Sequence, residues 1–124
     1  FASVVADRQS TYDYFRMAIP MFSESYAAFR ADRSWESAAP EVKHGYLRMW
    51  NNTDFSEETQ GLETPILVVL GEYDESFNQL VMPFWSDWYP NSEIVIGANA
   101  THHITEDTPV FVASAIENFL AQHR

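Results

Sequence analysis

The sequence predicts a fold of the α/β class, in which a helical segment precedes a β-α-β-α unit with parallel strands. Two observations carry this prediction. Apolar residues recur at helical spacing in the first third of the chain, and two short β-rich runs alternate with helical patterns in its second half. With 124 residues, of which 46% are hydrophobic, the chain is long enough for one compact domain with its own core.

The first third is predicted to be helical. Six apolar residues follow one another at alternating steps of three and four, which predicts a shared helical face: Tyr12, Phe15, Ile19, Phe22, Tyr26 and Phe29. Because Pro20 removes a backbone donor inside this run, we expect a kink or a break there.

A second helical segment is predicted after a loop over residues 34–39. Pro40 suits a first helical turn, and the helix is expected to run from Glu41 to about Asn51. Its apolar positions are Val42, Tyr46, Met49 and Trp50. The polar residues 51–54 then end it.

The second half begins with the run PILVVLG, which is typical of a strand buried on both faces of a parallel sheet. A helical stripe follows, in which Pro83 introduces a kink or delays the start: Phe77, Leu80, Val81, Phe84, Trp85 and Trp88. A second strand is expected over Glu93–Ile96. Thr108 and Pro109 are the predicted N-cap and first turn of a last helix, with Val112, Ile116, Phe119 and Leu120 on its inner face.

The composition excludes several classes of function. A net charge of −11, from 18 acidic against 7 basic residues, opposes a nucleic-acid partner, which requires a basic surface. We see no apolar run of membrane-spanning length and no secretion signal, so we expect no membrane partner and take a cytoplasmic location as the default. The absence of cysteine excludes disulfides and thiolate metal sites.

Two residues with catalytic chemistry follow the predicted strands. Asp74 comes three residues after Gly71, and His102 comes six residues after Ile96. Functional groups of open α/β sheets collect in the loops at the carboxyl ends of the strands, so we expect the two side chains to lie close together. A carboxylate beside an imidazole is the orienting acid and the general base of a nucleophile triad.

The segments TPILVVLGEYDE and PNSEIVIGANATHHITEDTPV, with the closing helix, resemble the carboxyl-terminal part of an α/β-hydrolase. That family orders its triad as Ser, then an acid, then His, and the resemblance implies that Asp74 is the acid and His102 the base. Asp107 and Pro109 complete the match to the histidine loop. Within the family, GEYDE resembles proline iminopeptidases, and residues 46–65 resemble esterase-like or lactonase-like hydrolases.

The family's Gly-x-Ser-x-Gly elbow is not present in these residues, and the chain begins with Phe1 rather than Met. We therefore expect the nucleophile on an amino-terminal half of the same protein that lies upstream. The resemblance then implies that residues 1–55 are a helical lid and residues 56–124 are the carboxyl-terminal part of the hydrolase core. His103, Phe22 and Tyr26 are the expected contacts to a small-molecule substrate, and we expect no cofactor and no metal.

Simpler interpretations stand beside these. Asp74 is a common residue type after a strand, His102 and His103 are compatible with an ordinary loop, and Glu72 and Glu75 are expected to be solvated. On an extended loop, the side chains of His102 and His103 point to opposite sides.

Three functions remain open: a serine-type hydrolase acting on an ester, lactone, amide or amino-terminal peptide bond, a non-catalytic binding module of the same fold, and a metal-dependent hydrolase using both histidines. The apolar face of the lid is also expected to favour association, including homo-oligomers.

Overall fold

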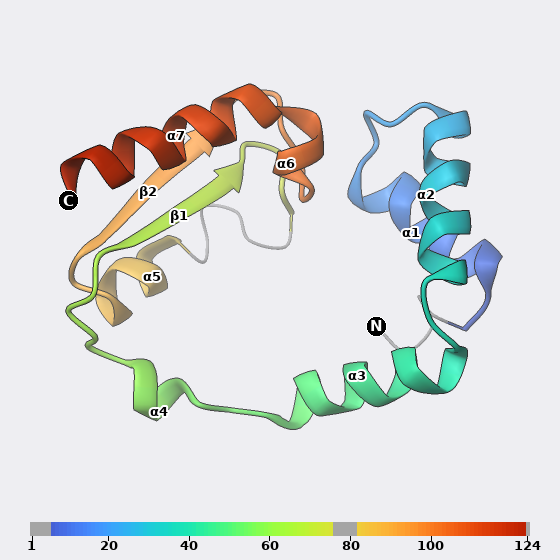
Figure 1. Cartoon of the computed structure of the whole chain (residues 1–124), viewed down its shortest axis with the longest axis horizontal. Coiled ribbons are helices and arrows are strands. Elements are labelled where there is room, and N and C mark those ends of the chain that lie inside the picture. Colours follow the sequence, from blue (N-terminus) through green and yellow to red (C-terminus); the bar gives the residue numbers. More distant parts are fainter. Residues whose placement is uncertain (1–5, 76–81, 124) are drawn as a thin grey trace. The chain divides into compact units, whose positions relative to one another are not determined.

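The computed structural model describes residues 6–75 and 82–123. The chain forms two compact units, Phe1–Phe55 and Ser56–Arg124. The first unit contains the helices α1 (Arg8–Ala18), α2 (Glu24–Glu36) and α3 (Pro40–Asn52). The second contains α4 (Ser56–Thr59), β1 (Ile66–Gly71), α5 (Met82–Trp88), β2 (Ser92–Gly97), α6 (Ile104–Asp107) and α7 (Pro109–Gln122) (Figure 1). The predicted mixture of helices and parallel strands is confirmed at the level of the α/β class.

The first unit is built on the packing of α1 against α2. Asp7 caps α1 by accepting a hydrogen bond from the Ser10 amide at 2.7 Å, and the Ser23 hydroxyl caps α2 by accepting one from the Tyr26 amide at 3.2 Å. Arg8 of α1 also pairs with Asp32 of α2. The break predicted at Pro20 is confirmed, because α1 ends at Ala18 and α2 begins at Glu24.

The prediction of one helical face shared by six apolar residues is only partly confirmed. Phe15, Ile19 and Phe22 are buried, whereas Tyr26 and Phe29 are 40% and 52% exposed. The break around Pro20 starts a new helix with its own rotational phase, and α2 turns its small residues Ala27 and Ala31 into the core instead. The expected loop over 34–39 is also too long, because α2 continues through Glu36.

The helix predicted from Glu41 to about Asn51 is confirmed as α3, within one residue at either end. Its apolar positions lie on one face, as their spacing requires, but that face is open to solvent. All four side chains are more than half exposed: Val42, Tyr46, Met49 and Trp50.

The second unit contains the predicted parallel strand pair. β1 and β2 run side by side in a register that pairs Ile66 with Ser92 and Gly71 with Gly97. The two arrows therefore end at the same edge of the sheet, and α7 runs back along them in the opposite direction (Figure 1). Among the described residues α5 spans Met82–Trp88, and Pro83 lies within it. Phe77, Leu80 and Val81 of the predicted stripe lie outside the described residues.

Burial in this unit is less complete than the sequence predicted. Residues 66–69 of β1 are half-buried rather than covered on both faces, and only Leu70 and Gly71 are buried. In α7, Val112 is buried, but Ile116 and Leu120 are 44% and 54% exposed. The buried cluster of Ala100, Ile104 and Val112, with Val69 and Phe111 packed against it, includes residues of α7 only from its first turn.

The connection between β2 and α7 also differs from the predicted loop, because it contains the short helix α6. The Thr108 amide donates to the Ile104 carbonyl at 2.9 Å and so ends α6. Thr108 is the N-cap residue of α7 and Pro109 lies in its first turn, as predicted, but the Thr108 hydroxyl donates to the Ile104 carbonyl, at 3.3 Å, and makes no capping hydrogen bond to α7. α4, before β1, was likewise not predicted.

Among residues 6–75 and 82–123, no helix has the length and apolar character that a membrane span requires.

Candidate active site

The site begins where the two strands end. Gly71 and Gly97 are paired neighbours in the sheet, so the residues that follow them leave from adjacent strand tips. Backbone hydrogen bonds then join the two loops. The Glu72 amide donates to the Gly97 carbonyl at 3.0 Å, and the Tyr73 amide donates to the Ala100 carbonyl at 2.8 Å. The loop after β1 is therefore fixed against the loop after β2.

A side chain reinforces this junction. Glu72 is exposed, as expected, and its carboxylate also accepts a hydrogen bond from the backbone amide of Asn99 at 2.9 Å. Asn99 has a φ of 57°, in the left-handed region that asparagine tolerates better than most residues. The turn at Asn99 is thus held by the loop after β1.

Gly71 lets the histidine loop approach the end of β1 closely. A Cβ atom at this position would lie 2.3 Å from the Thr101 carbonyl oxygen and 2.6 Å from the Ala100 carbonyl oxygen. Both contacts are with backbone and are far shorter than van der Waals separation. The residue that closes the strand therefore needs to be glycine for the loop to sit where it does.

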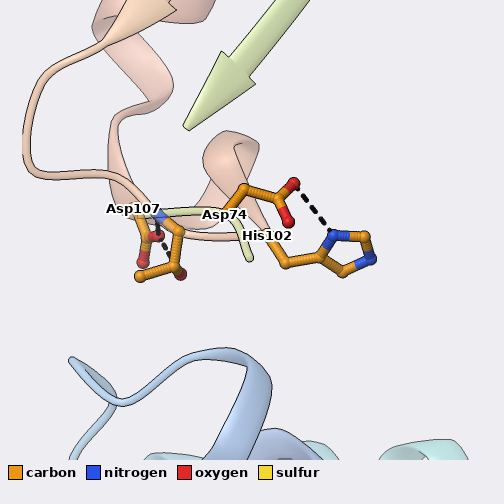
Figure 2. A network of polar contacts seen from close by, with 4 residues as sticks. Asp74, His102 and Asp107 are labelled. Atoms are coloured by element: carbon orange, nitrogen blue, oxygen red, sulfur yellow. Dashed lines mark hydrogen bonds and ion pairs between the residues drawn. The ribbon is translucent and has the colours of Figure 1, made fainter. Parts of the chain in front are cut away.

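Asp74 and His102 meet at this edge of the sheet. His102 Nδ1 lies 3.1 Å from Asp74 Oδ2, within hydrogen-bonding distance, as the positions of the two residues after the strands predicted. Asp74 is 5% exposed and the His102 side chain is 29% exposed, so a buried carboxylate faces a partly accessible ring. Figure 2 shows the two side chains pointing toward each other, with the other ring nitrogen of His102 directed away from Asp74.

This arrangement suits acid–base chemistry. A carboxylate that accepts the Nδ1–H proton fixes the ring orientation and the tautomer, which leaves Nε2 as the basic nitrogen. The same carboxylate stabilises the imidazolium that forms when Nε2 takes up a proton.

His103 lies in the same turn but contacts a different acid. Its Nδ1 is 3.7 Å from Glu106 Oε1, and its ring packs edge-to-face against that of His102, with the centroids 5.4 Å apart. The two residues lie in a turn that leads into α6 rather than on an extended loop. The expectation that their side chains point to opposite sides is therefore wrong, although their Nδ1 atoms face different carboxylates.

The other expected substrate contacts, Phe22 and Tyr26, belong to the first unit. Their rings pack edge-to-face with centroids 4.6 Å apart. Phe22 is 8% exposed and forms part of the α1–α2 core, whereas Tyr26 is partly accessible. Of these two side chains, Tyr26 is the one that is exposed enough to contact a ligand.

Asp107 has a structural role that the sequence did not indicate. Its Oδ2 accepts hydrogen bonds from both the amide of Thr101, at 2.7 Å, and its hydroxyl, at 2.6 Å. Thr101 is 1% exposed and directly precedes His102. The sequence singled out Asp107 only as part of the family pattern, because its contact with Thr101 depends on the short helix α6, which was not predicted.

Within the described part of the chain, no group of three or more His, Cys, Asp or Glu side chains is arranged to hold a metal ion. His102 and His103 instead each face a carboxylate.

Comparison of the chain with protein-family models, with curated proteins and with solved structures found no match.

Proposed function

We propose that residues 56–124 supply the acid and the base of a serine-type α/β-hydrolase, with Asp74 as the orienting acid and His102 as the general base. The observation that carries this proposal is the 3.1 Å contact between a buried carboxylate and a partly exposed imidazole at the ends of two adjacent parallel strands. Such strand ends are where α/β proteins place their reactive groups. The order of the acid before the histidine is also the order of that family.

In this mechanism Asp74 accepts the Nδ1–H proton of His102 and holds the ring in place. Nε2 takes the proton of a serine hydroxyl as that oxygen attacks the substrate carbonyl. The resulting imidazolium then gives the proton to the leaving group, and the cycle repeats with water as the nucleophile. Neither step requires a metal or a cofactor.

The proposal assigns the serine and the oxyanion-binding amides to residues outside these 124. It also assigns residues 1–55 to a lid, in which the exposed ring of Tyr26 contributes an aromatic surface for a small ester, lactone, amide or amino-terminal peptide substrate, and the buried ring of Phe22 packs against that of Tyr26. His103 borders the base and would contact the substrate rather than transfer its proton.

The test compares the product of the complete reading frame with the 124-residue chain. Both are incubated with a simple activated ester and with a fluorophosphonate probe, which reacts covalently with activated serines. The longer protein is expected to be labelled and to turn over the ester. The 124-residue chain is expected to show no turnover above that of its His102→Ala variant, because it lacks the nucleophile.

Two outcomes contradict the proposal. Turnover by the 124-residue chain that depends on His102 means that the nucleophile lies within it. A folded longer protein that is neither labelled nor active favours the non-catalytic binding module instead.

A further inference from the structure

The segment before His102 is held by a carboxylate that is not part of the acid–base pair. One oxygen of Asp107 accepts two hydrogen bonds from Thr101, one from the backbone amide and one from the hydroxyl. Both are short, at 2.7 and 2.6 Å, and both involve a charged acceptor, which makes them stronger than bonds between neutral groups. In Figure 2 the dashed lines at Asp107 and the one between Asp74 and His102 belong to the same small network.

These two hydrogen bonds restrict the movement of Thr101, which is buried. Thr101 is 1% exposed, so its amide and hydroxyl require partners inside the protein. Its carbonyl lies against Gly71, at a distance that leaves no room for a Cβ atom. The residue is therefore confined on one side by the end of β1 and on the other by Asp107 at the end of α6.

His102 is the next residue, and its contact with Asp74 tolerates little movement. At 3.1 Å the Nδ1–Oδ2 distance is near the long end of the hydrogen-bonding range, so a displacement of about 1 Å would break it. Rotation of the backbone at Thr101 changes the direction of the His102 side chain directly. A group that fixes Thr101 therefore fixes the orientation of the ring.

We propose that Asp107 is a positioning residue, which clamps Thr101 and thereby directs His102 Nδ1 toward Asp74. The inference rests on the proposed function in taking the Asp74–His102 pair as an acid and a base. Asp107 acts through Thr101 and exchanges no proton itself. It differs in this from Glu106, its neighbour on α6, whose carboxylate faces His103.

The experiment measures the tautomer of His102 in the 124-residue chain labelled with ¹⁵N-histidine. Long-range ¹H–¹⁵N spectra are recorded at about pH 9, well above the ordinary titration range of an imidazole. The wild type is expected to show His102 as the Nδ1–H tautomer, because Asp74 accepts that proton. The urea-unfolded chain provides the ratio for an unconstrained ring, and the His102→Ala variant assigns the signal.

Asp107→Ala is expected to shift the His102 signals toward the ratio of the unfolded chain. Thr101→Val, which keeps the amide but removes the hydroxyl, is expected to give a smaller shift in the same direction. Thr101→Ser restores both donors and is expected to restore the wild-type ratio. Glu106→Gln is the matched control on the same helix, and it should leave His102 unchanged.

The outcomes separate this inference from the proposed function. A wild-type His102 without the Nδ1–H preference overturns the acid–base pair and the positioning role with it. A wild-type preference that persists unchanged in both Asp107→Ala and Thr101→Val overturns the positioning role alone. If Asp107→Ala does not fold, the comparison of Thr101→Val with Thr101→Ser tests the positioning role. A purely structural role of the Thr101–Asp107 bond would lower the stability of Thr101→Val without changing the tautomer of His102 in the folded molecules.

Discussion

Asp74 and His102 are separated by 28 positions in the sequence, yet His102 Nδ1 lies 3.1 Å from Asp74 Oδ2. The parallel register of β1 and β2 brings them together, because Gly71 and Gly97 end the two strands side by side. The loops that follow are then joined by hydrogen bonds between backbone groups and to the carboxylate of Glu72, and the carboxylate of Asp107 holds Thr101 within the histidine loop. The geometry of the Asp74–His102 pair thus depends on the hydrogen bonds that hold the loop after β2 against the end of β1.

Gly71→Ala is expected to destabilise the second unit by about 1–3 kcal/mol or more, the usual cost of inserting atoms where neighbours cannot move away. The added Cβ would meet two carbonyl oxygens of the backbone at 2.3 and 2.6 Å. The measurement is urea denaturation followed through the NMR signals of β1. A variant as stable as the wild type would show that the loop does not approach the strand so closely.

Gly45→Ala is the matched control for that substitution. Its Cβ would meet nothing within 4 Å, and the residue lies inside α3, where alanine is the better helix former. We expect a gain of roughly 0.5–1 kcal/mol in the first unit. A loss there would indicate that replacing glycine is unfavourable for reasons unrelated to the approach at Gly71.

Thr101→Val is expected to lower the free energy of unfolding of the second unit by about 1.5–3 kcal/mol, since it removes a buried hydrogen bond to a charged acceptor. The side chains are close in volume, so packing changes little. Thr105→Val is the control, because Thr105 is exposed on α6, and its effect should stay within about 0.5 kcal/mol. Equal effects of the two substitutions in urea denaturation would remove the energetic role of the Thr101–Asp107 bond.

The N-terminal end of α1 is expected to depend on pH. Hydrogen bonds from the amide and the side chain of Ser10 lower the pKa of Asp7 below its ordinary value of 3.8. A lowered carboxyl pKa stabilises the folded form above the unfolded-state pKa, and this contribution is lost as the pH falls through the folded-state pKa. The helix cap should therefore persist above pH 3.8 and weaken below it.

The measurement for this cap is the amide proton shift of Ser10, titrated from about pH 6 to about pH 2, a range that spans the ordinary carboxyl pKa values. The expected midpoint lies below 3.8. Asp7→Asn keeps an N-cap acceptor without a titrating group and should abolish the transition. A midpoint at or above 3.8 in the wild type would contradict the assignment of the cap.

The pair of site residues could be predicted from the sequence because their proximity depends only on the type and order of the secondary-structure elements. Two β-rich runs separated by a helical pattern imply parallel strands, and parallel strands place Asp74 and His102 at one edge. The role of Asp107 depends instead on α6, a helix of four residues that is too short to produce a periodic pattern. Without that turn, nothing in the spacing indicates that Asp107 returns to Thr101.

The packing of the first unit shows a second limit. The aromatic residues suggested one continuous face, but the break between α1 and α2 resets the helical phase. Ala27 and Ala31 then allow the close approach of α2 to α1, while Phe29 remains exposed. Sequence periodicity predicts a face within one helix and does not extend across a break.

The most direct test of the central claim is the rate at which the fluorophosphonate probe labels the complete protein and two of its variants. His102→Ala is expected to slow labelling by on the order of 10³-fold or more, as the loss of a triad member does, because the serine loses its base. His103→Ala, at the neighbouring ring whose Nδ1 faces Glu106, is expected to slow it by roughly tenfold or less. The reverse ranking would move the base to His103, and equal rates in all three proteins would mean that the Asp74–His102 pair does not activate a nucleophile.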